Sequence, residues 1–205
     1  METDHLTGIG APRAVAAAPA ERSRRIPPWL LRLGMNLWPP FLGARIRVRR
    51  MAADMRRVVV EMPLRRTNRN SLGTHFGGSL FAMTDPFYAL MLQYNLPRDM
   101  IIWDKAAAIE FVAPGRGRVQ ATLEIADADI DAILAATAQG EKHLHVFTAE
   151  IVDDEGLVVA RVEKIVYVRR RAVRAEARRE AAAAQPAGRE ASPRPFSSSI
   201  QASSR

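Results

Sequence analysis

The sequence contains no cysteine among its 205 residues. This absence excludes disulfides, thiolate nucleophiles and every metal or iron–sulfur site that needs a cysteine ligand. It says little about the compartment beyond permitting a reducing cytosol, and a cytoplasmic protein is the default expectation. Any nucleophile must come from another residue type.

Long apolar runs are lacking as well. The best candidate for a membrane span, residues 26–43, is broken by Arg32 and four prolines, whereas a transmembrane helix needs roughly 18 apolar residues. A signal peptide is a poor interpretation too, because Arg24 and Arg25 are followed by that same broken segment and no small-residue cleavage pattern appears. No transmembrane segment is expected.

Acidic charge is scarce only at the ends of the chain. Residues 1–25 carry four arginines against three acids, and residues 169–205 carry nine arginines against three acids. Residues 26–168 carry seventeen basic residues against sixteen acids, so their net charge is only +1 out of the total of +8. The sequence pI of 10.8 is therefore largely a property of the C-terminal segment, and no nucleic-acid partner is expected.

Composition divides the chain into one domain and two tails. With 48% hydrophobic residues, the chain can bury one core of ordinary size. Residues 1–25 and 170–205 are rich in Ala, Arg, Ser and Pro without an apolar period, which predicts disordered tails. The folded domain is expected at residues 26–169.

The first folded segment predicts a short amphipathic helix that ends at Pro39 and Pro40. The favoured interpretation packs this helix over the edge of the core. The alternative is an interfacial anchor or a substrate lid, so that residues 26–42 make peripheral contact with a membrane. The apolar residues that recur at helical spacing are Trp29, Leu30, Leu33, Leu37 and Trp38.

The remaining elements predict an α+β fold. Residues 45–51 and 56–64 read as a hairpin with one arginine-rich face, and residues 78–94 are apolar nearly all round, as in a buried helix. A small helix is expected near 127–140. Further strand-like runs are 108–112, 118–125, 143–152 and 157–168. The result is an antiparallel sheet of about six strands around one long apolar helix, with a short N-terminal helix and the small inserted helix.

Chemistry is concentrated between Asn70 and Asp85. Gly77 and Gly78 permit a tight turn at the start of the apolar helix, where unpaired amides and partial positive charge suit an oxyanion. A carboxylate at Asp85 is costly in so apolar a helix unless it is paired or functional. Pro86 predicts a kink that either exposes this carboxylate or adapts the helix to the sheet.

This run resembles the central-helix motif of hotdog-fold acyl-CoA thioesterases. The positions that match are Asn70, Gly73, Thr74, Gly77, Gly78 and Asp85. Phe76 replaces the histidine that precedes the glycine pair in the family, and His75 stands one step earlier. The chain also resembles a bacterial branch of this superfamily over roughly residues 30–168, from NLWPPFLG through WDKAA to GRGRV. That branch is catalogued as a domain of unknown function and is related to tetrameric acyl-CoA thioesterases.

The resemblance implies hydrolysis of an acyl-CoA or acyl-carrier thioester without a metal or redox cofactor. Asp85 would act as general base or nucleophile, Asn70 would hold the water or the carbonyl, and the Gly78 amide would polarise the carbonyl. In a continuous helix Gly78 and Asp85 would lie roughly 10 Å apart, too far to share one carbonyl. A composite site between protomers of a homodimer or homotetramer is therefore expected.

The substrate-binding candidates surround this motif. They are His75, Phe76, Gly77 and Phe81, together with Arg116 and Arg118, which are placed to meet CoA phosphates if they do not merely face water. The acyl chain length is not fixed by the sequence, because it depends on how residues such as Phe81, Phe87 and Tyr88 close a tunnel.

Each functional interpretation has a structural alternative. Asp85 would be structural if it paired with Arg65 or Arg66. Asp104 and Lys105 would be near the site or, more simply, form an ion pair at a strand end. His143 and His145 point to one side of a strand, but without a clear third ligand they are expected to be ordinary strand residues rather than a metal site.

Two other functions compete with hydrolysis. A non-catalytic acyl or acyl-CoA binding module would use the same tunnel without turnover. A hotdog dehydratase or hydratase ranks last, because it needs a suitably placed catalytic histidine and the hydratase signature D-x-N-P-x-x-H is absent.

Overall fold

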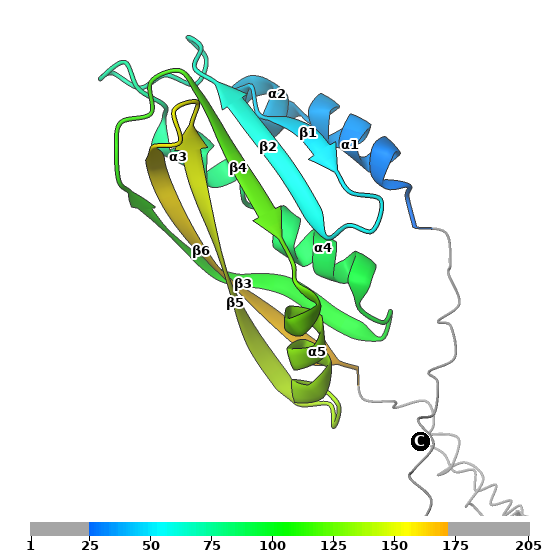
Figure 1. Cartoon of the computed structure of the whole chain (residues 1–205). Coiled ribbons are helices and arrows are strands. Elements are labelled where there is room, and N and C mark those ends of the chain that lie inside the picture. Colours follow the sequence, from blue (N-terminus) through cyan, green and yellow to red (C-terminus); the bar gives the residue numbers. More distant parts are fainter. Residues whose placement is uncertain (1–24, 172–205) are drawn as a thin grey trace, which may run out of the picture. The chain divides into compact units, whose positions relative to one another are not determined.

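The computed structural model describes residues 25–171 (Figure 1). The predicted disordered tails, 1–25 and 170–205, lie outside the described residues except for Arg25, Arg170 and Arg171. No helix within the described part of the chain is long and apolar enough to cross a membrane.

Six antiparallel strands form one sheet in the order β1-β2-β4-β5-β6-β3. The strands are β1 Arg47–Met51, β2 Arg57–Pro63, β3 Met100–Phe111, β4 Arg118–Glu124, β5 Lys142–Asp153 and β6 Val158–Arg170. Alternate residues of β4 and β6 are buried on the face that meets the helices, as their period-two patterns require. β1 and β3 are the two edges of the sheet, and β3 begins eight residues before the strand predicted at 108–112.

The apolar segment forms two helices rather than one. α3 spans Gly77–Ala82 and α4 spans Phe87–Asn95, and Figure 1 shows the sheet wrapping around α4. The amides of Thr84 and Asp85 bond to carbonyls three residues earlier, and Pro86 has no amide with which to restore the α-helical pattern. The expected kink is thus a complete break, and it places Asp85 in a turn.

The N-terminal segment forms α1 Pro28–Leu37 and α2 Pro39–Ala44, so the proline pair ends one helix and begins the next. Asn36 of α1 donates to the carbonyl of Val48 at 3.1 Å and accepts from its amide at 2.8 Å. This side chain therefore occupies backbone groups of the edge strand β1 that a further strand would otherwise pair.

α1 packs over the edge strand β1, as the favoured interpretation expected, but not through the predicted apolar stripe. Met35 is buried in α1, and Leu31 packs partly against the core. The residues of the predicted stripe are all exposed: Trp29, Leu30, Leu33, Leu37 and Trp38. The helix is apolar on two faces, and the sequence pattern selected the outer one.

The inserted helix is α5, Asp127–Ala136. Asp129 accepts from the amide of Ala126 at 2.8 Å and so caps its first turn. Ile130 and Ile133 of this helix are buried.

Candidate active site

Asn70 organises the loop that precedes α3. Its side-chain amide donates to Thr74 Oγ1 at 2.9 Å and to the carbonyl of His75 at 3.2 Å. Its Oδ1 accepts from the amides of Leu72 at 2.9 Å and Thr74 at 3.1 Å. Both N–H groups and the oxygen are thus engaged within the loop, which is how an Asn fixes a local turn. In this arrangement Asn70 shapes the site through the backbone of its neighbours.

His75 joins this loop to the loop between β3 and β4. Its side chain is only 3% exposed, and its Nε2 lies 2.9 Å from the carbonyl of Gly117. Because a carbonyl can only accept, Nε2 carries the hydrogen, and the buried Nδ1 has a lone pair without a hydrogen-bond partner among the described residues. Burial lowers the pKa of His75, partly offset by the bond to Gly117, so the ring is neutral at pH 7.

The glycine pair lies at the start of α3 under two aromatic rings. A Cβ on Gly77 would lie 2.7 Å from the ring of Phe111, and a Cβ on Gly78 would lie 2.5 Å from the ring of Phe76. The next two amides both bond to the carbonyl of Phe76, whereas those of Gly77 and Gly78 have no acceptor within residues 25–171. With the rings in these positions a Cβ at either glycine would displace an exposed ring, and the first turn keeps free donors.

A cleft of about 630 Å³ opens beside this helix start. It brings together four of the nine predicted site residues, which are Asn70, His75, Gly77 and Arg116. Its lining does not include the other five, which are Gly78, Phe76, Phe81, Asp85 and Arg118. Apolar side chains complete the wall, mainly Leu72, Leu80, Phe111 and Val112.

The two candidate phosphate ligands differ in their surroundings. Arg118 donates to Asp154 at 2.7 and 2.8 Å and lies 3.8 Å from Glu61, so its guanidinium is already neutralised. Arg116 is exposed on the wall of the cleft and makes no ion pair with any described residue. Of the two, Arg116 is the guanidinium available to an anionic ligand.

Asp85 pairs with a lysine and not with Arg65 or Arg66, the partners considered from the sequence. Its Oδ1 accepts from Lys164 Nζ of β6 at 2.7 Å. The Lys164 side chain is 1% exposed, whereas the Asp85 side chain is 54% exposed. The buried ammonium therefore holds one carboxylate oxygen, and the rest of the carboxylate faces solvent.

Asp104 is the second carboxylate of this cluster. It lies within β3 rather than at its end, and its Oδ2 is 3.4 Å from Lys164 Nζ, so the expected ion pair with Lys105 is replaced by one with Lys164. Its buried Oδ1 has no hydrogen-bond partner within residues 25–171. Burial raises the pKa of Asp104, and the neighbouring Lys164 opposes this effect. The ring of Phe81, 5.7 Å from Lys164 Nζ, lies against the same ammonium.

Lys164 is the residue that the sequence interpretation missed. It occupies an inward-facing position of β6 between Val162 and Val166, both of which are buried. The signal that would have identified it is a lysine at a position whose alternate neighbours along the strand are apolar, since a buried ammonium requires a partner.

The inner face of the sheet is incompletely covered beside the free edge of β3. Ala107 and Phe111 pair with the inward residues Lys164 and Ala160 of β6 but remain exposed. Phe76 is exposed as well, whereas Trp103 of β3 stacks on Tyr167 on the opposite face of the sheet. An edge strand with open apolar side chains is suited to contact with another chain.

His143 and His145 do face one side of β5, as predicted. His143 Nε2 lies 3.2 Å from His145 Nδ1, and His145 Nε2 lies 3.2 Å from Asp129 Oδ1. Burial, and then the neighbouring His145, lower the pKa of His143. Residues 25–171 contain no group of three or more His, Asp or Glu arranged to hold a metal ion.

Several solved structures share this architecture. A probable thioesterase of unknown function from Pseudomonas aeruginosa has a TM-score of 0.62 at 18% identity, over 71% of this chain and 97% of that one. A thioesterase from Haemophilus influenzae gives 0.52 at 13% identity, over 71% and 92%. A second P. aeruginosa thioesterase, solved as a mutant, gives 0.53 at 12% identity, over 72% and 97%.

At these identities the likeness concerns the fold, and it confirms the predicted hotdog fold. Among proteins with curated functions, none matches this sequence. The family model described as "Domain of unknown function (DUF4442)" matches residues 28–168, and the chain therefore belongs to that family.

Proposed function

We propose that this protein hydrolyses acyl-CoA thioesters, with the carboxylate of Asp85 acting on the substrate. The observation that supports this most is the contact between Asp85 and Lys164. One carboxylate oxygen is held at 2.7 Å by an ammonium that is itself buried, and the other makes no hydrogen bond within the described residues. The ion pair therefore fixes the orientation of this carboxylate and leaves its second oxygen free to act on a substrate.

Two reaction courses fit a carboxylate in this position. As a general base, Asp85 takes a proton from a water whose oxygen attacks the thioester carbonyl; the C–S bond then breaks and the CoA thiolate leaves with that proton. As a nucleophile, Asp85 attacks the carbonyl and expels the thiolate, and water hydrolyses the resulting anhydride. The free acid and CoA are the products of both.

We propose that the site is shared between protomers of a homodimer or homotetramer. On one chain the cleft at the helix start includes Gly77 but neither Gly78 nor Asp85, so the cleft of a single chain does not bring the Gly78 amide and the carboxylate together. The uncovered inner face beside β3 offers a contact surface for a second chain. The Gly78 amide of one protomer would then polarise the carbonyl that Asp85 of the other attacks. The solved structures named as thioesterases support the proposed thioester hydrolysis itself.

The remaining predicted residues take supporting roles in the proposal. Asn70 positions the loop that carries His75, and neutral His75 lines the cleft with its Nδ1 buried and its Nε2 bonded to the carbonyl of Gly117. Arg116 meets a CoA phosphate at the cleft wall, and no metal or redox cofactor takes part. A cytoplasmic location, which the cysteine-free sequence permits, remains part of the proposal.

The test is release of free thiol from a panel of acyl-CoA esters by the purified full chain. The protein has no cysteine, so the enzyme itself adds no thiol background. We expect turnover that is lost in Asp85→Asn and retained in Asp131→Asn, because Asp131 is an exposed residue of α5 that makes no ion pair in the described part of the chain. Saturable binding of acyl-CoA with no turnover by the unmodified chain would instead identify a non-catalytic binding module.

A further inference from the structure

An exposed apolar face runs along α1 and α2. Its members are Trp29, Leu30, Leu33, Leu37, Trp38 and Leu42, and we call this set the α1–α2 apolar face. Trp29 is 65% exposed and Leu37 is 62% exposed, although both are large apolar side chains. Scattered exposed leucines are ordinary, but six such side chains within fourteen consecutive residues form a patch that needs an explanation.

Packing of α1 against the domain does not account for this face. At 3.6 residues per turn, Trp29, Leu33 and Leu37 fall within an arc of about 80°. Leu31 and Met35, which pack against the core, lie on the other side of the helix. The outer face is therefore additional to the apolar surface that the fold requires.

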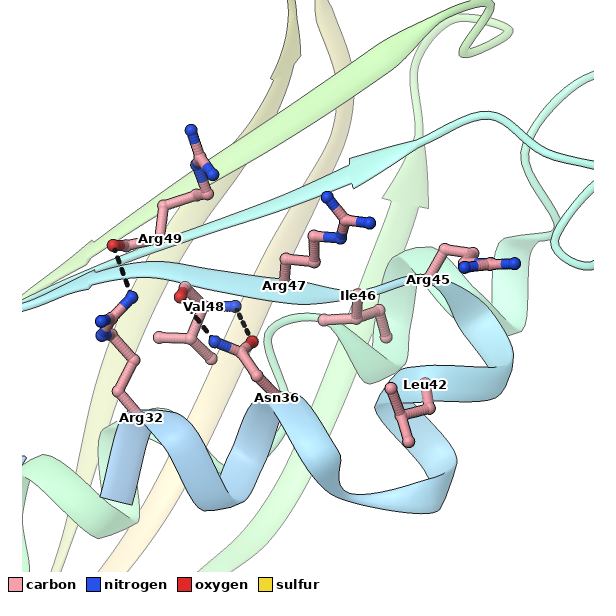
Figure 2. Close-up of a pocket in the computed structure, with 8 residues that line it drawn as sticks. All are labelled: Arg32, Asn36, Leu42, Arg45, Ile46, Arg47, Val48 and Arg49. Atoms are coloured by element: carbon pink, nitrogen blue, oxygen red, sulfur yellow. Dashed lines mark hydrogen bonds between the residues drawn. The ribbon is translucent and has the colours of Figure 1, made fainter. Parts of the chain in front are cut away.

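A cleft lined by arginines lies directly beside this face, between α1–α2 and β1 (Figure 2). Its volume is about 360 Å³, and four of its eight lining residues are arginines: Arg32, Arg45, Arg47 and Arg49. Leu42 belongs to both the cleft and the α1–α2 apolar face. Apolar and cationic groups thus meet along one boundary of the molecule.

Most of this positive charge is unneutralised. Arg49 pairs with Glu61 at 3.2 Å. Arg32 bonds only to the carbonyl of Arg49, at 3.5 Å, and Arg45 and Arg47 make no ion pair within the described residues. Residues 25–57 contain eight arginines and a single acid, Asp54. The surface is therefore suited to a ligand that is both apolar and anionic.

We propose that α1 and α2 dock the protein on an anionic phospholipid bilayer. The α1–α2 apolar face enters the interfacial region, where tryptophan rings and leucines are favourable, and the arginine cleft receives lipid phosphates. A two-fold contact between two copies of this face fits less well, because it would place unpaired arginines such as Arg45 and Arg47 against their own copies. The proposal is independent of the hydrolytic function.

Co-sedimentation with vesicles tests the proposal on the full chain. The vesicles contain phosphatidylcholine alone or equimolar phosphatidylcholine and phosphatidylglycerol. We expect partition onto the mixed vesicles only, weakened more than tenfold in Leu33→Ser/Leu37→Ser and about fivefold per residue in Arg45→Gln and Arg47→Gln. Leu157→Ser, at an exposed leucine away from this face, should leave partition unchanged.

The basic C-terminal segment requires a separate control, because it could attract anionic vesicles by itself. Arg178→Gln/Arg179→Gln has the same net charge as Arg45→Gln/Arg47→Gln and should lower partition less. An equal loss in both double variants would overturn the proposal. Size-exclusion chromatography adds a second measurement: loss of an oligomer in Leu33→Ser/Leu37→Ser, with no vesicle binding by the unmodified chain, would identify the face as a subunit interface.

Fluorescence provides a measurement that does not depend on a destabilising variant. Trp103→Phe leaves Trp29 and Trp38 as the only tryptophans of the chain. We expect a blue shift of their emission with mixed vesicles and none with phosphatidylcholine alone. Unchanged emission with both kinds of vesicle would contradict insertion of the face.

Discussion

Lys164 Nζ donates to Asp85 Oδ1 at 2.7 Å and lies 3.4 Å from Asp104 Oδ2, so one buried ammonium serves two carboxylates of different exposure. The contact joins β6 to the turn between α3 and α4 and to the edge strand β3. It therefore fixes the broken helix against the sheet at the point where the proposed chemistry takes place.

Lys164→Met should reduce both stability and activity. The variant leaves Asp104 half-buried without its counter-charge, and we expect a loss of about 1–3 kcal/mol in the free energy of unfolding. Asp85 also loses its anchor, so thioester hydrolysis should fall while Asp85 itself is present. Denaturant unfolding and thiol release measure the two effects. The matched control is Lys105→Met, since Lys105 is exposed on β3 and makes no ion pair with another described residue.

Asp104 predicts a pH dependence of stability. Because its pKa is raised in the folded protein, the folded state holds the proton more tightly than the unfolded chain does. Its favourable contribution is therefore complete below the ordinary pKa of 3.8 and is lost as pH rises through the raised value. We expect Asp104→Asn to gain stability relative to the unmodified chain between mildly acidic and neutral pH. A constant difference in unfolding free energy across that range would contradict this assignment.

His75 predicts the opposite dependence. Burial lowers its pKa from the ordinary 6.5, so the unfolded chain binds the proton more readily than the folded one. Its contribution is present above pH 6.5 and is lost as pH falls through the lowered value. His75→Gln should flatten the decline of melting temperature with acidification. His143 has a lowered pKa for a similar reason, and comparison with His143→Gln separates the two contributions.

Much of this fold follows from periodicity. Alternating apolar residues can bury only one face of β4 and β6, and a segment as apolar as α4 must be buried on most sides. A sheet around a helix could therefore be predicted. The break at residues 83–86 could be predicted only in part, because Pro86 indicates a kink but does not show whether the helix continues through it or ends and starts again. The two faces of α1 are ambiguous in the same way, because both are apolar and only the tertiary contacts select the inner one.

The site was less accessible to prediction than the fold. The motif identified Asp85 and the glycines by their spacing, but the partner of Asp85 lies 79 residues away on another strand. A choice between Lys164 and nearby arginines depends on strand register across the sheet, which a local pattern does not determine. Likewise, the engagement of Asn70 within its own loop depends on hydrogen-bond geometry and not on residue type.

Gly78→Ala tests the role of Phe76 over the helix start. The new Cβ would lie 2.5 Å from the Phe76 ring, but that ring is exposed and free to move, so we expect a cost of about 1 kcal/mol or less in unfolding free energy. Phe76→Ala should remove this cost in the double variant, which a double-mutant cycle measures. An equal cost with and without the Phe76 ring would show that the ring is not the obstacle.

The shared site makes a prediction about mixed oligomers. Asp85→Asn should lower turnover about 10²–10⁴-fold, and Gly78→Val should block the helix start, so each variant alone has little activity. In a mixed dimer, one site would combine the intact Gly78 of one protomer with the intact Asp85 of the other. Random pairing makes half of the dimers mixed with one working site of two, so co-expressed chains should recover about a quarter of the unmodified activity. Thiol release by the co-purified mixture, compared with the sum of the separate variants, measures this recovery. Activity equal to that sum would place Asp85 and Gly78 of the same chain in one site.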